Sequence, residues 1–380
     1  MEVKKVYIIR NCYEPNIASI NRSLAFSKGY GELGVDTKVV FVFPNYKKDR
    51  VEQSFLNVEF LYLWEKYCPS NKYLRNVFLR FALLLFVLRL KKDDTVLLYG
   101  TINPWYLFCL KRNIRIYNEI TEHPRIHTER NGLVGKIQYW LFGKFCRRID
   151  GVMPITPSLS EFFVDEFGIA REKVQTINMI VDSTRFDSVR GDKRKSTIAY
   201  CGTISEKKDG ISDLLKAFQI VLTRYKDATL TLIGDFESSV TRENVYALLK
   251  TLKIENNVLI TGMISADEMP VFLSEAKVLA LSRPQNMQAK YGFPTKLGEY
   301  LMTANPVVIT DVGDFRLYLK DREDIVYAAP DNFTDFADKL LWVLDNYDQA
   351  KIIGMKGRQV ALDSFNYRIE AEKVLDFIFK

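Results

Sequence analysis

Short apolar runs alternate with longer segments of helical character along the C-terminal half of the chain. The short runs have the length of β-strands and cover residues 196–202, 228–234, 257–262, 277–282 and 305–310. The longer segments have the length of helices and cover residues 211–223, 242–252 and 266–276. In the first of these, Leu214, Phe218 and Val221 recur at the spacing of one helical face. Strands that alternate with helices in this way predict a parallel, doubly wound α/β sheet.

The N-terminal half repeats the alternation less regularly. Its strand-length runs cover residues 6–9, 37–43, 58–63, 95–99, 114–119, 151–155 and 174–177. A hydrophilic stretch at residues 182–196 separates the two halves, and a chain of 380 residues is long enough for two domains. We therefore predict two Rossmann-like α/β domains, one over residues 1–182 and the other over residues 183–364.

One segment of the C-terminal half, residues 292–301 with the sequence GFPTKLGEYL, has the pattern of a ligand-binding loop and helix start. Pro294 sets φ for a first helical turn, and Thr295 offers a side-chain cap. The unpaired N–H groups of a helix start favour a phosphate, and Lys296 adds a full positive charge there. Glu299, one turn further on, has two carboxylate oxygens for the two hydroxyls of a ribose. The segment therefore predicts a nucleotide-diphosphate site.

This segment resembles the donor-site signature P-(S/T)-K-x-x-E-Y-(L/M) of retaining, nucleotide-sugar-dependent glycosyltransferases of group 1 (family 4-like), which have the GT-B fold. In that family, a Glu eight residues before the ribose-binding Glu usually contacts the donor sugar. Tyr291 stands at this position here, so we predict that it lies beside the sugar. The resemblance implies that the donor, a UDP- or GDP-sugar, contacts Gly292, Phe293, Pro294, Thr295, Lys296, Leu297 and Glu299.

A second loop follows the strand predicted at residues 196–202. It runs from Gly202 to Gly210, at the edge where an open α/β sheet places its ligand. The loop resembles the family motif G-(R/S/T)-x-S-x-x-K-x-G, which implies that Lys208 contacts the donor diphosphate. Thr203 stands where many relatives carry an Arg. Gly234 and Asp235, after the next strand, resemble the turn that binds the base. By themselves, the lysines of this loop are better explained as solvated surface charges, but the second phosphate motif at residues 292–301 favours a role in binding the donor.

The acceptor side is less clearly marked. Glu122 and His123 follow the strand predicted at residues 114–119, at its carboxyl end. A general base at this place would have to reach the acceptor hydroxyl, and relatives often carry a His or an acid near it. A loop histidine bonded to backbone is the alternative for His123. The resemblance also implies two domains that face a central cleft, with a last helix, residues 365–380, returning to the N-terminal domain.

Cysteine and histidine content limits the other chemistry. The five cysteines contain no CxxC pair and are odd in number, which indicates reduced thiols in a cytoplasmic protein. Two histidines, His123 and His127, exclude a His-rich metal site. We predict no metal and no cofactor other than the sugar nucleotide, which is a co-substrate.

Positive charge is concentrated in one segment. Residues 72–148 carry fifteen Lys or Arg and five Asp or Glu, an excess of ten that exceeds the net charge of +7 for the whole chain. We infer an anionic surface as a partner of the N-terminal half. No recognised nucleic-acid-binding module is present, so nucleic acid is not expected.

Two helical segments lie within this basic region. Residues 81–88 are all apolar but too short to span a bilayer, and a buried helix is the favoured interpretation. In residues 132–148, Lys136, Lys144, Arg147 and Arg148 share one face with Trp140, and Val134, Ile137, Leu141 and Phe145 share the other. This pattern fits either peripheral attachment to the inner face of a membrane or a core helix with a solvated basic back.

These features predict a cytoplasmic GT-B glycosyltransferase that moves a sugar from a nucleotide diphosphate to an acceptor hydroxyl. The resemblance implies retention of configuration, no divalent metal, and a place in the assembly of surface polysaccharide or lipid-linked glycan. Lys208, Lys296 and the amides of residues 295–297 would hold the charge of the departing diphosphate. The alternatives are a GT-B sugar-nucleotide epimerase and a catalytically inactive nucleotide-binding scaffold, the latter because an acid at Tyr291 and an Arg at Thr203 are missing.

Overall fold

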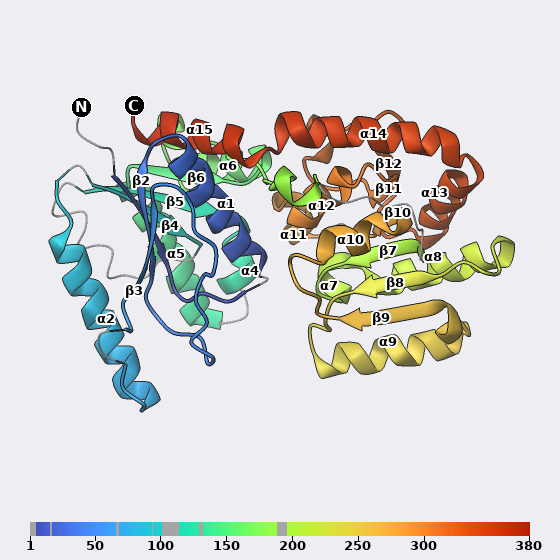
Figure 1. Cartoon of the computed structure of the whole chain (residues 1–380), viewed down its shortest axis with the longest axis horizontal. Coiled ribbons are helices and arrows are strands. Elements are labelled where there is room, and N and C mark those ends of the chain that lie inside the picture. Colours follow the sequence, from blue (N-terminus) through green and yellow to red (C-terminus); the bar gives the residue numbers. More distant parts are fainter. Residues whose placement is uncertain are drawn as a thin grey trace. The chain divides into compact units, whose positions relative to one another are not determined.

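The computed structural model describes residues 5–15, 17–65, 68–92, 94–100, 114–128, 132–187 and 196–380. The chain divides into two compact units (Figure 1). The first unit consists of Met1–Ile180 and Tyr367–Lys380, and the second consists of Val181–Asn366. These bounds lie two residues from the predicted ones. Most of the predicted hydrophilic boundary, residues 188–195, lies outside the described residues.

The first unit is built on a six-stranded parallel sheet with the order β3-β2-β1-β4-β5-β6. Strand order reverses between β1 and β4, which pair with Ile8 opposite Leu97. The predicted strand at residues 174–177 is wrong, because Val174 forms only an isolated bridge with Val152. The strands are β1 (Lys5–Arg10), β2 (Asp36–Phe41), β3 (Val58–Tyr62), β4 (Thr95–Tyr99), β5 (Arg115–Ile120) and β6 (Gly151–Pro154).

Helices of the first unit include the last helix of the chain. Helix α15 packs against α1, where a Cβ built on Gly29 would lie 2.7 Å from that of Ala371. The Tyr367 hydroxyl also donates to Glu32 at 3.0 Å. The described helices are α1 (Ala18–Glu32), α2 (Lys72–Arg89), α4 (Arg125–Thr128), α5 (Gly132–Arg148), α6 (Pro157–Asp165), the 3-10 turn η3 (Arg171–Lys173) and α15 (Tyr367–Ile378).

A second six-stranded parallel sheet, with the order β12-β11-β10-β7-β8-β9, forms the centre of the second unit. Its strand order reverses between β7 and β10. All four residues of β8 and of β11 are buried, as expected for parallel strands covered on both faces. The strands are β7 (Ser196–Cys201), β8 (Leu230–Ile233), β9 (Val258–Gly262), β10 (Ala276–Leu281), β11 (Val307–Thr310) and β12 (Val326–Ala328).

Helices connect the strands of the second unit, and the two parallel sheets confirm the predicted fold class. The predicted helix at residues 266–276 is shorter in the structure, because Ala276 already begins β10. The helical elements are η4 (Ser183–Phe186), α7 (Glu206–Asp209), α8 (Ile211–Arg224), α9 (Ser239–Leu252), η5 (Glu255–Asn257), α10 (Met269–Ser274), α11 (Met287–Tyr291), α12 (Thr295–Met302), η6 (Phe315–Leu317), α13 (Phe333–Asp345) and α14 (Tyr347–Ser364).

Two helices of the first unit expose apolar residues that the sequence pattern assigned to the core. In α2, only Leu79, Leu83 and Val87 are buried, so the prediction of a buried helix over residues 81–88 is wrong. Seven large apolar side chains of α2 are exposed: Tyr73, Leu74, Val77, Phe78, Phe81, Leu85 and Leu88.

In α5, the alternative of a core helix fails for three of the four apolar residues that shared a face in the sequence pattern. Val134, Ile137 and Leu141 are each at least 50% exposed, and only Phe145 is buried. The physical reason is that glycines face the core: Gly135 and Gly143 are buried, and a Cβ on Gly143 would lie 2.8 Å from the Phe167 ring. None of the helices in the described ranges is long and apolar enough to cross a bilayer.

Candidate functional site

Four of the predicted donor residues of the second unit gather at the carboxyl end of β7, where the strand order reverses: Gly202, Gly234, Asp235 and Lys296. Ligands of open α/β sheets bind at such a reversal. Two glycine turns meet there: Gly202 has φ +143°, Gly234 has φ +138°, and a Cβ on Gly234 would lie 2.1 Å from the Gly202 carbonyl oxygen. The Ile204 amide donates to the Asp235 carbonyl at 2.8 Å. Only glycine allows this approach of backbone to backbone.

Lys296 reaches this pair of turns from α12. Its ammonium donates to the Asp209 carboxylate at 2.6 Å and to the Tyr200 hydroxyl at 3.2 Å. A Cβ on Gly202 would lie 2.3 Å from the Lys296 Nζ. The structure therefore brings Lys296 together with the loop that begins at Gly202, as the two predicted phosphate motifs require.

Asp209 is 2% exposed and has two cationic neighbours. Burial alone raises the pKa of the Asp209 carboxyl, but the Lys296 ammonium and the Arg283 guanidinium outweigh it and hold this pKa below its ordinary value. Burial, followed by the charge of Asp209, raises the pKa of the Tyr200 hydroxyl. Two cations thus share one carboxylate, which leaves a net positive charge beside the glycine turns.

The start of α12 differs from the predicted one. The helix begins at Thr295, Pro294 stands at the N-cap in an extended conformation, and no side chain caps the helix. The predicted Thr295 cap and the predicted place of Pro294 in the first turn are therefore wrong. The Leu297 amide, predicted to bind phosphate, already donates to the Pro294 carbonyl at 3.1 Å. Among the described residues, the amides of Thr295 and Lys296 have no hydrogen-bond acceptor.

Glu299, predicted to bind the ribose, forms an ion pair in this structure. Its Oε1 accepts from Arg185 at 2.6 Å, and the two side chains are 22% and 25% exposed. Arg185 comes from η4, and it also donates to the Ala266 carbonyl. One of the two carboxylate oxygens that a ribose diol would use is therefore occupied by an arginine.

Lys208 lies on the short helix α7, and its side chain is exposed. The N-cap residue Ser205 accepts from the Lys208 amide at 3.2 Å. Within the described part of the chain, the Lys208 ammonium has no ion-pair partner. Thr203 is also exposed, and its carbonyl lies 2.7 Å from the Tyr200 hydroxyl.

Three other predicted donor residues lie in different surroundings. Tyr291 is the last residue of α11 and is half-buried, with the Lys290 ammonium 5.1 Å from its ring centre. The Phe293 side chain points into an aromatic cluster, with ring centres 5.0 Å from Phe315 and 5.3 Å from Phe365. The Leu297 side chain is fully buried. Phe293 and Leu297 can therefore meet a ligand only through backbone.

The predicted acceptor residues Glu122 and His123 lie in the first unit, directly beyond β5. His123 is 3% exposed, its ring centre lies 4.2 Å from that of Phe162, and its Nδ1 accepts from the Arg125 amide at 3.2 Å. This geometry corresponds to the alternative of a loop histidine bonded to backbone. The acceptor role of both residues stays a prediction.

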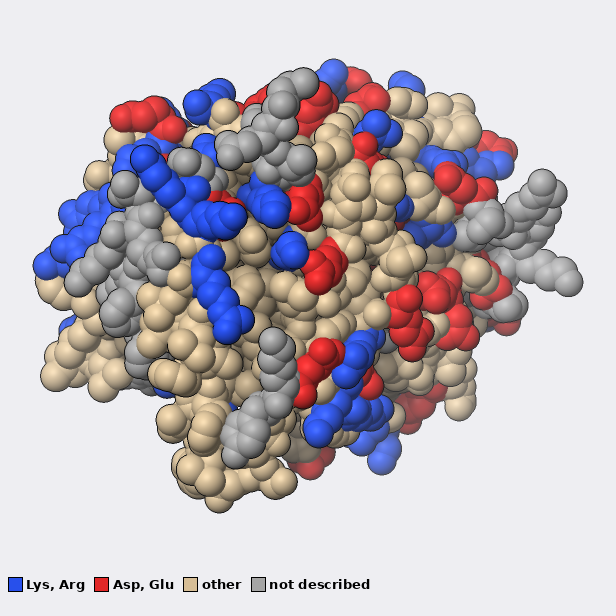
Figure 2. Space-filling model, turned by 60° about the vertical axis from the view of Figure 1, so that its left-hand side comes forward, with Lys and Arg blue, Asp and Glu red and all other residues tan. Residues whose placement is uncertain are grey.

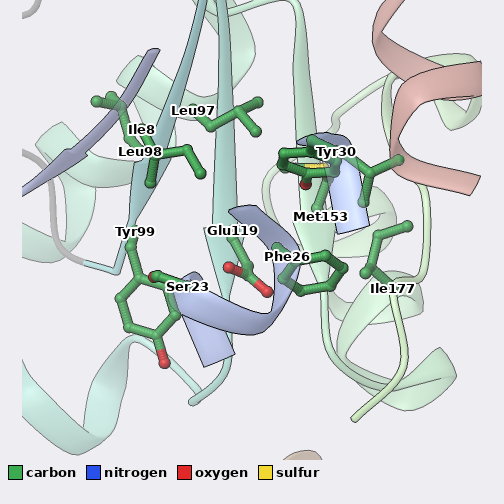
Figure 3. Close-up of a pocket in the computed structure, with 11 residues that line it drawn as sticks. Ile8, Ser23, Phe26, Tyr30, Leu97, Leu98, Tyr99, Glu119, Met153 and Ile177 are labelled. Atoms are coloured by element: carbon green, nitrogen blue, oxygen red, sulfur yellow. The ribbon is translucent and has the colours of Figure 1, made fainter. Parts of the chain in front are cut away.

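A small cavity lies between α1 and the sheet of the first unit (Figure 3). Ser23, Phe26 and Tyr30 line it from α1, and Tyr99 and Glu119 line it from β4 and β5. Its volume of about 20 Å³ is enough for one water molecule. The cavity is therefore too small for a sugar in this conformation.

Sequence reasoning missed the partners of the predicted residues. Asp209 stands between Lys208 and Gly210 in the loop that was singled out, and Tyr200 is the only large polar side chain in its strand. Asp209 carried a usable signal, because an acid between the cations of a basic loop needs a cationic partner once it is buried. Arg185 and Arg283 carried none, since nothing in their local sequence indicates their distant partners.

A metal site is not apparent in the described ranges, since no group of three or more His, Cys, Asp or Glu lies close enough together to hold an ion. Cys12, Cys68, Cys146 and Cys201 are free thiols. Burial raises the pKa of the Cys201 thiol to about 12. That thiol therefore stays protonated and unreactive at neutral pH.

Comparisons with solved structures find the same fold over the whole chain at low identity. HepE of Anabaena, in a complex with UDP and glucose, has a TM-score of 0.77 and 14% identity, and the match covers 99% of this chain and 100% of that one. Sucrose-phosphate synthase of Thermosynechococcus elongatus has a TM-score of 0.78 and 13% identity, with 98% of both chains covered. TarM of S. aureus, in a complex that includes UDP, has a TM-score of 0.73 and 14% identity, with 99% of this chain and 100% of that one covered.

Sequence comparison places a known domain in the second unit. No curated protein is significantly similar to the chain in sequence. Residues 195–346 match the family model described as glycosyl transferases group 1, and this range contains β7 to β12 with the loops that carry Lys208 and Lys296. The match confirms the predicted resemblance. The second unit of the chain therefore contains a glycosyl transferases group 1 domain, and the whole chain has the two-domain fold of GT-B glycosyltransferases.

Proposed function

We propose that this protein transfers a sugar from a UDP-sugar to an acceptor hydroxyl. One observation carries the proposal: the Lys296 ammonium lies against the Gly202 turn, at the strand-order reversal of a group 1 domain. UDP is favoured as the nucleotide because it is present in the complexes of HepE and TarM.

The chemistry that these residues support is stabilisation of a leaving group. A departing UDP gains negative charge on its diphosphate, and preorganised donors lower the energy of that charge. These donors would be the ammonium groups of Lys296 and of the exposed Lys208, together with the amides of Thr295 and Lys296. We propose that this happens without a divalent metal and with retention of configuration, as the resemblance implies.

Glu299 would bind the ribose in competition with Arg185. Its Oε1 accepts from Arg185 at 2.6 Å, so a ribose diol must either share the carboxylate or displace the guanidinium. Tyr291 would lie beside the donor sugar, where a phenol replaces the usual carboxylate.

The experiment is a donor panel followed by turnover. Melting temperatures are measured with UDP, GDP, ADP and TDP and with their sugars, because a ligand that binds only the folded state raises the melting temperature. We expect UDP and one UDP-sugar to give the largest rise. Release of UDP in the presence of an acceptor panel then measures transfer.

Each rival has its own outcome in that experiment. A sugar-nucleotide epimerase would convert the donor sugar without releasing UDP, and an inactive scaffold would bind UDP without any turnover. Absence of a shift with every nucleotide would contradict the proposed donor site itself.

The surface of the first unit has features that favour binding to an anionic membrane. Trp140 is 53% exposed on α5, and the Lys144 ammonium lies 3.7 Å from its ring centre. Figure 2 brings α2 forward: Lys and Arg side chains gather at the upper left, and a broad area without Asp or Glu extends below them. Exposed apolar side chains beside cations are typical of helices that lie in a membrane interface.

We therefore propose that α2 and α5 attach the protein to the inner face of a membrane. Basic residues near an anionic lipid surface each contribute about 1 kcal/mol, and apolar side chains add to this by entering the interface. A lipid-linked acceptor, in surface polysaccharide or glycan assembly, would be reached from this position.

A further inference from the structure

Arg10 is a buried cation that forms no ion pair with an acidic side chain in the described part of the chain. The residue is 8% exposed, and its Nη1 is buried without a hydrogen-bond partner. Its other contacts are neutral: Nη2 donates to the Ser19 hydroxyl at 2.9 Å, and the guanidinium lies 4.0 Å from the ring centre of Tyr99. A buried charge without a partner is costly, so its presence needs an explanation.

Arg22 provides an internal comparison. It is also buried, but its guanidinium bonds the Glu119 carboxylate and the carbonyls of Asn178 and Ile177. Those contacts use the donors of Arg22 within the first unit, as a structural arginine requires. The charge of Glu119 also attracts Arg10 from a distance, but its carboxylate is hydrogen-bonded to Arg22 and not to Arg10.

The location of Arg10 is where a ligand is expected. It is the last residue of β1, and Tyr99 is the last residue of β4. Strand order in the first unit reverses between these two strands, and open α/β sheets bind ligands at that point.

Ser19 lies in the first turn of α1, a helix of 15 residues without an acidic residue in that turn and without a side-chain cap. Its amide end therefore adds to the positive potential at Arg10. Burial lowers the pKa of the Arg10 guanidinium, but an arginine stays charged at neutral pH.

We propose that Arg10 binds an oxyanion of the acceptor, a carboxylate or a phosphate, at the carboxyl edge of the first unit. The inference rests on the proposed function, because it names the chemical class of the acceptor. Nη1 of the guanidinium can donate to an oxyanion while Nη2 donates to Ser19. The contact with the Tyr99 ring fixes the orientation of the guanidinium plane.

The test uses the full chain with UDP saturating, so that the donor site is occupied. The probes are inorganic phosphate and glucuronate, with glucose as the neutral counterpart of glucuronate. We expect one or both anions, but not glucose, to raise the melting temperature of the wild type. A response to phosphate alone assigns a phosphorylated acceptor, and a response to glucuronate alone assigns an acidic sugar.

The variant Arg10→Gln removes the charge and keeps a polar side chain at this position. Since the wild type carries a buried cation with an unpartnered Nη1, this variant should melt no lower than the wild type without anion. Its affinity for the anion should fall by about tenfold or more. The matched control Arg22→Gln should melt lower with and without anion, because it leaves Glu119 unpaired.

Three results would overturn the proposal. The first is that neither anion stabilises the wild type. The second is that Arg10→Gln melts well below the wild type and keeps the anion response, as a structural arginine would. The third is loss of UDP binding in Arg10→Gln, which would assign Arg10 to the donor instead. If the wild type itself does not bind UDP, this result contradicts the proposed donor site and not the role of Arg10.

Discussion

Lys208 and its neighbour Lys207 allow a controlled test of the donor site at the scale of single residues. Both side chains are exposed on α7, so neither is needed for packing. Lys208→Ala should weaken binding of the UDP-sugar by about 1.5–3 kcal/mol, the contribution of a hydrogen bond to a charged group. Lys207→Ala should change it little. Calorimetric titration of UDP into both variants checks this, and equal losses would contradict the assignment of Lys208.

Asp209 makes the stability of the second unit depend on pH. The pKa of its carboxyl is held below the ordinary value of 3.8. Because the pKa is lower in the folded state, the ionised carboxylate stabilises the fold fully above the ordinary value, and this contribution is lost as the pH falls through the lower pKa of the folded state. Asp209→Asn should therefore cost about 3–5 kcal/mol at neutral pH, as expected when one partner of a buried pair is removed.

The measurement is denaturant unfolding of the wild type and Asp209→Asn from about pH 6 to about pH 3, over which their difference should shrink. Asp311→Asn is the control, since Asp311 forms an exposed ion pair with Arg316. Such pairs contribute about 1 kcal/mol or less. A difference that stays constant with pH would show that Asp209 acts through packing and not through charge.

At the scale of elements, the contact between α1 and α15 depends on a glycine. A Cβ on Gly29 would lie 2.7 Å from the Ala371 Cβ. Gly29→Ala would raise helix propensity by about 1 kcal/mol, but overpacking typically costs about 1–3 kcal/mol. We expect a lower melting temperature, by roughly 2–4 °C for each kcal/mol of net loss.

The compensating variant is Ala371→Gly, which removes the facing methyl group. The double variant Gly29→Ala with Ala371→Gly should recover part of the loss, because the new methyl group then occupies the space of the old one. Additive losses in the double variant would contradict a direct contact at this position.

The periodicity of apolar residues predicted most strands and helices, but it did not predict which faces of α2 and α5 are buried. Residues 228–234 and 307–310 are buried throughout or nearly so, and their β-branched runs identified β8 and β11 correctly. In α5, Gly143 packs closely against the Phe167 ring. A glycine has no side chain, so hydropathy does not mark this position as buried. The strand β12 has only three residues, too few for a pattern.

The donor site shows the same limit for polar residues. Sequence reasoning identified Lys296 and Glu299 by their resemblance to a known motif. It could not identify their partners Asp209 and Arg185, because these are 87 and 114 residues away along the chain. Pairing between distant residues follows from the topology of the sheet, which a single sequence shows only as an order of elements.

At the scale of the whole molecule, attachment to a lipid surface can be tested by vesicle sedimentation. Wild-type protein should sediment with anionic vesicles at low salt and less at about 1 M salt, where the Debye length falls to about 3 Å. Changing Lys136, Lys144, Arg147 and Arg148 to Gln should remove most of the low-salt binding, since each cation contributes about 1 kcal/mol. A wild type that ignores anionic vesicles, or a quadruple variant that binds equally well, would make α5 a purely structural helix.

The apolar contribution can be separated from the charges. Val77→Ser with Phe81→Ser removes two exposed side chains of α2 without a change of charge. These substitutions should reduce the binding that persists at high salt and leave the salt-dependent part, because the two terms have different physical origins.

The return of α15 to the first unit has a consequence for the order in which the protein is made. The first unit needs residues 367–380, and the second unit lies between them and residue 180. All of the second unit is therefore synthesised before the first unit can be completed. Until then, the surface of α1 around Gly29 lacks its packing partner α15. Domains generally fold in the order in which they leave the ribosome. We expect the reverse here: the second unit folds first, and the first unit becomes resistant to protease only when α15 has emerged.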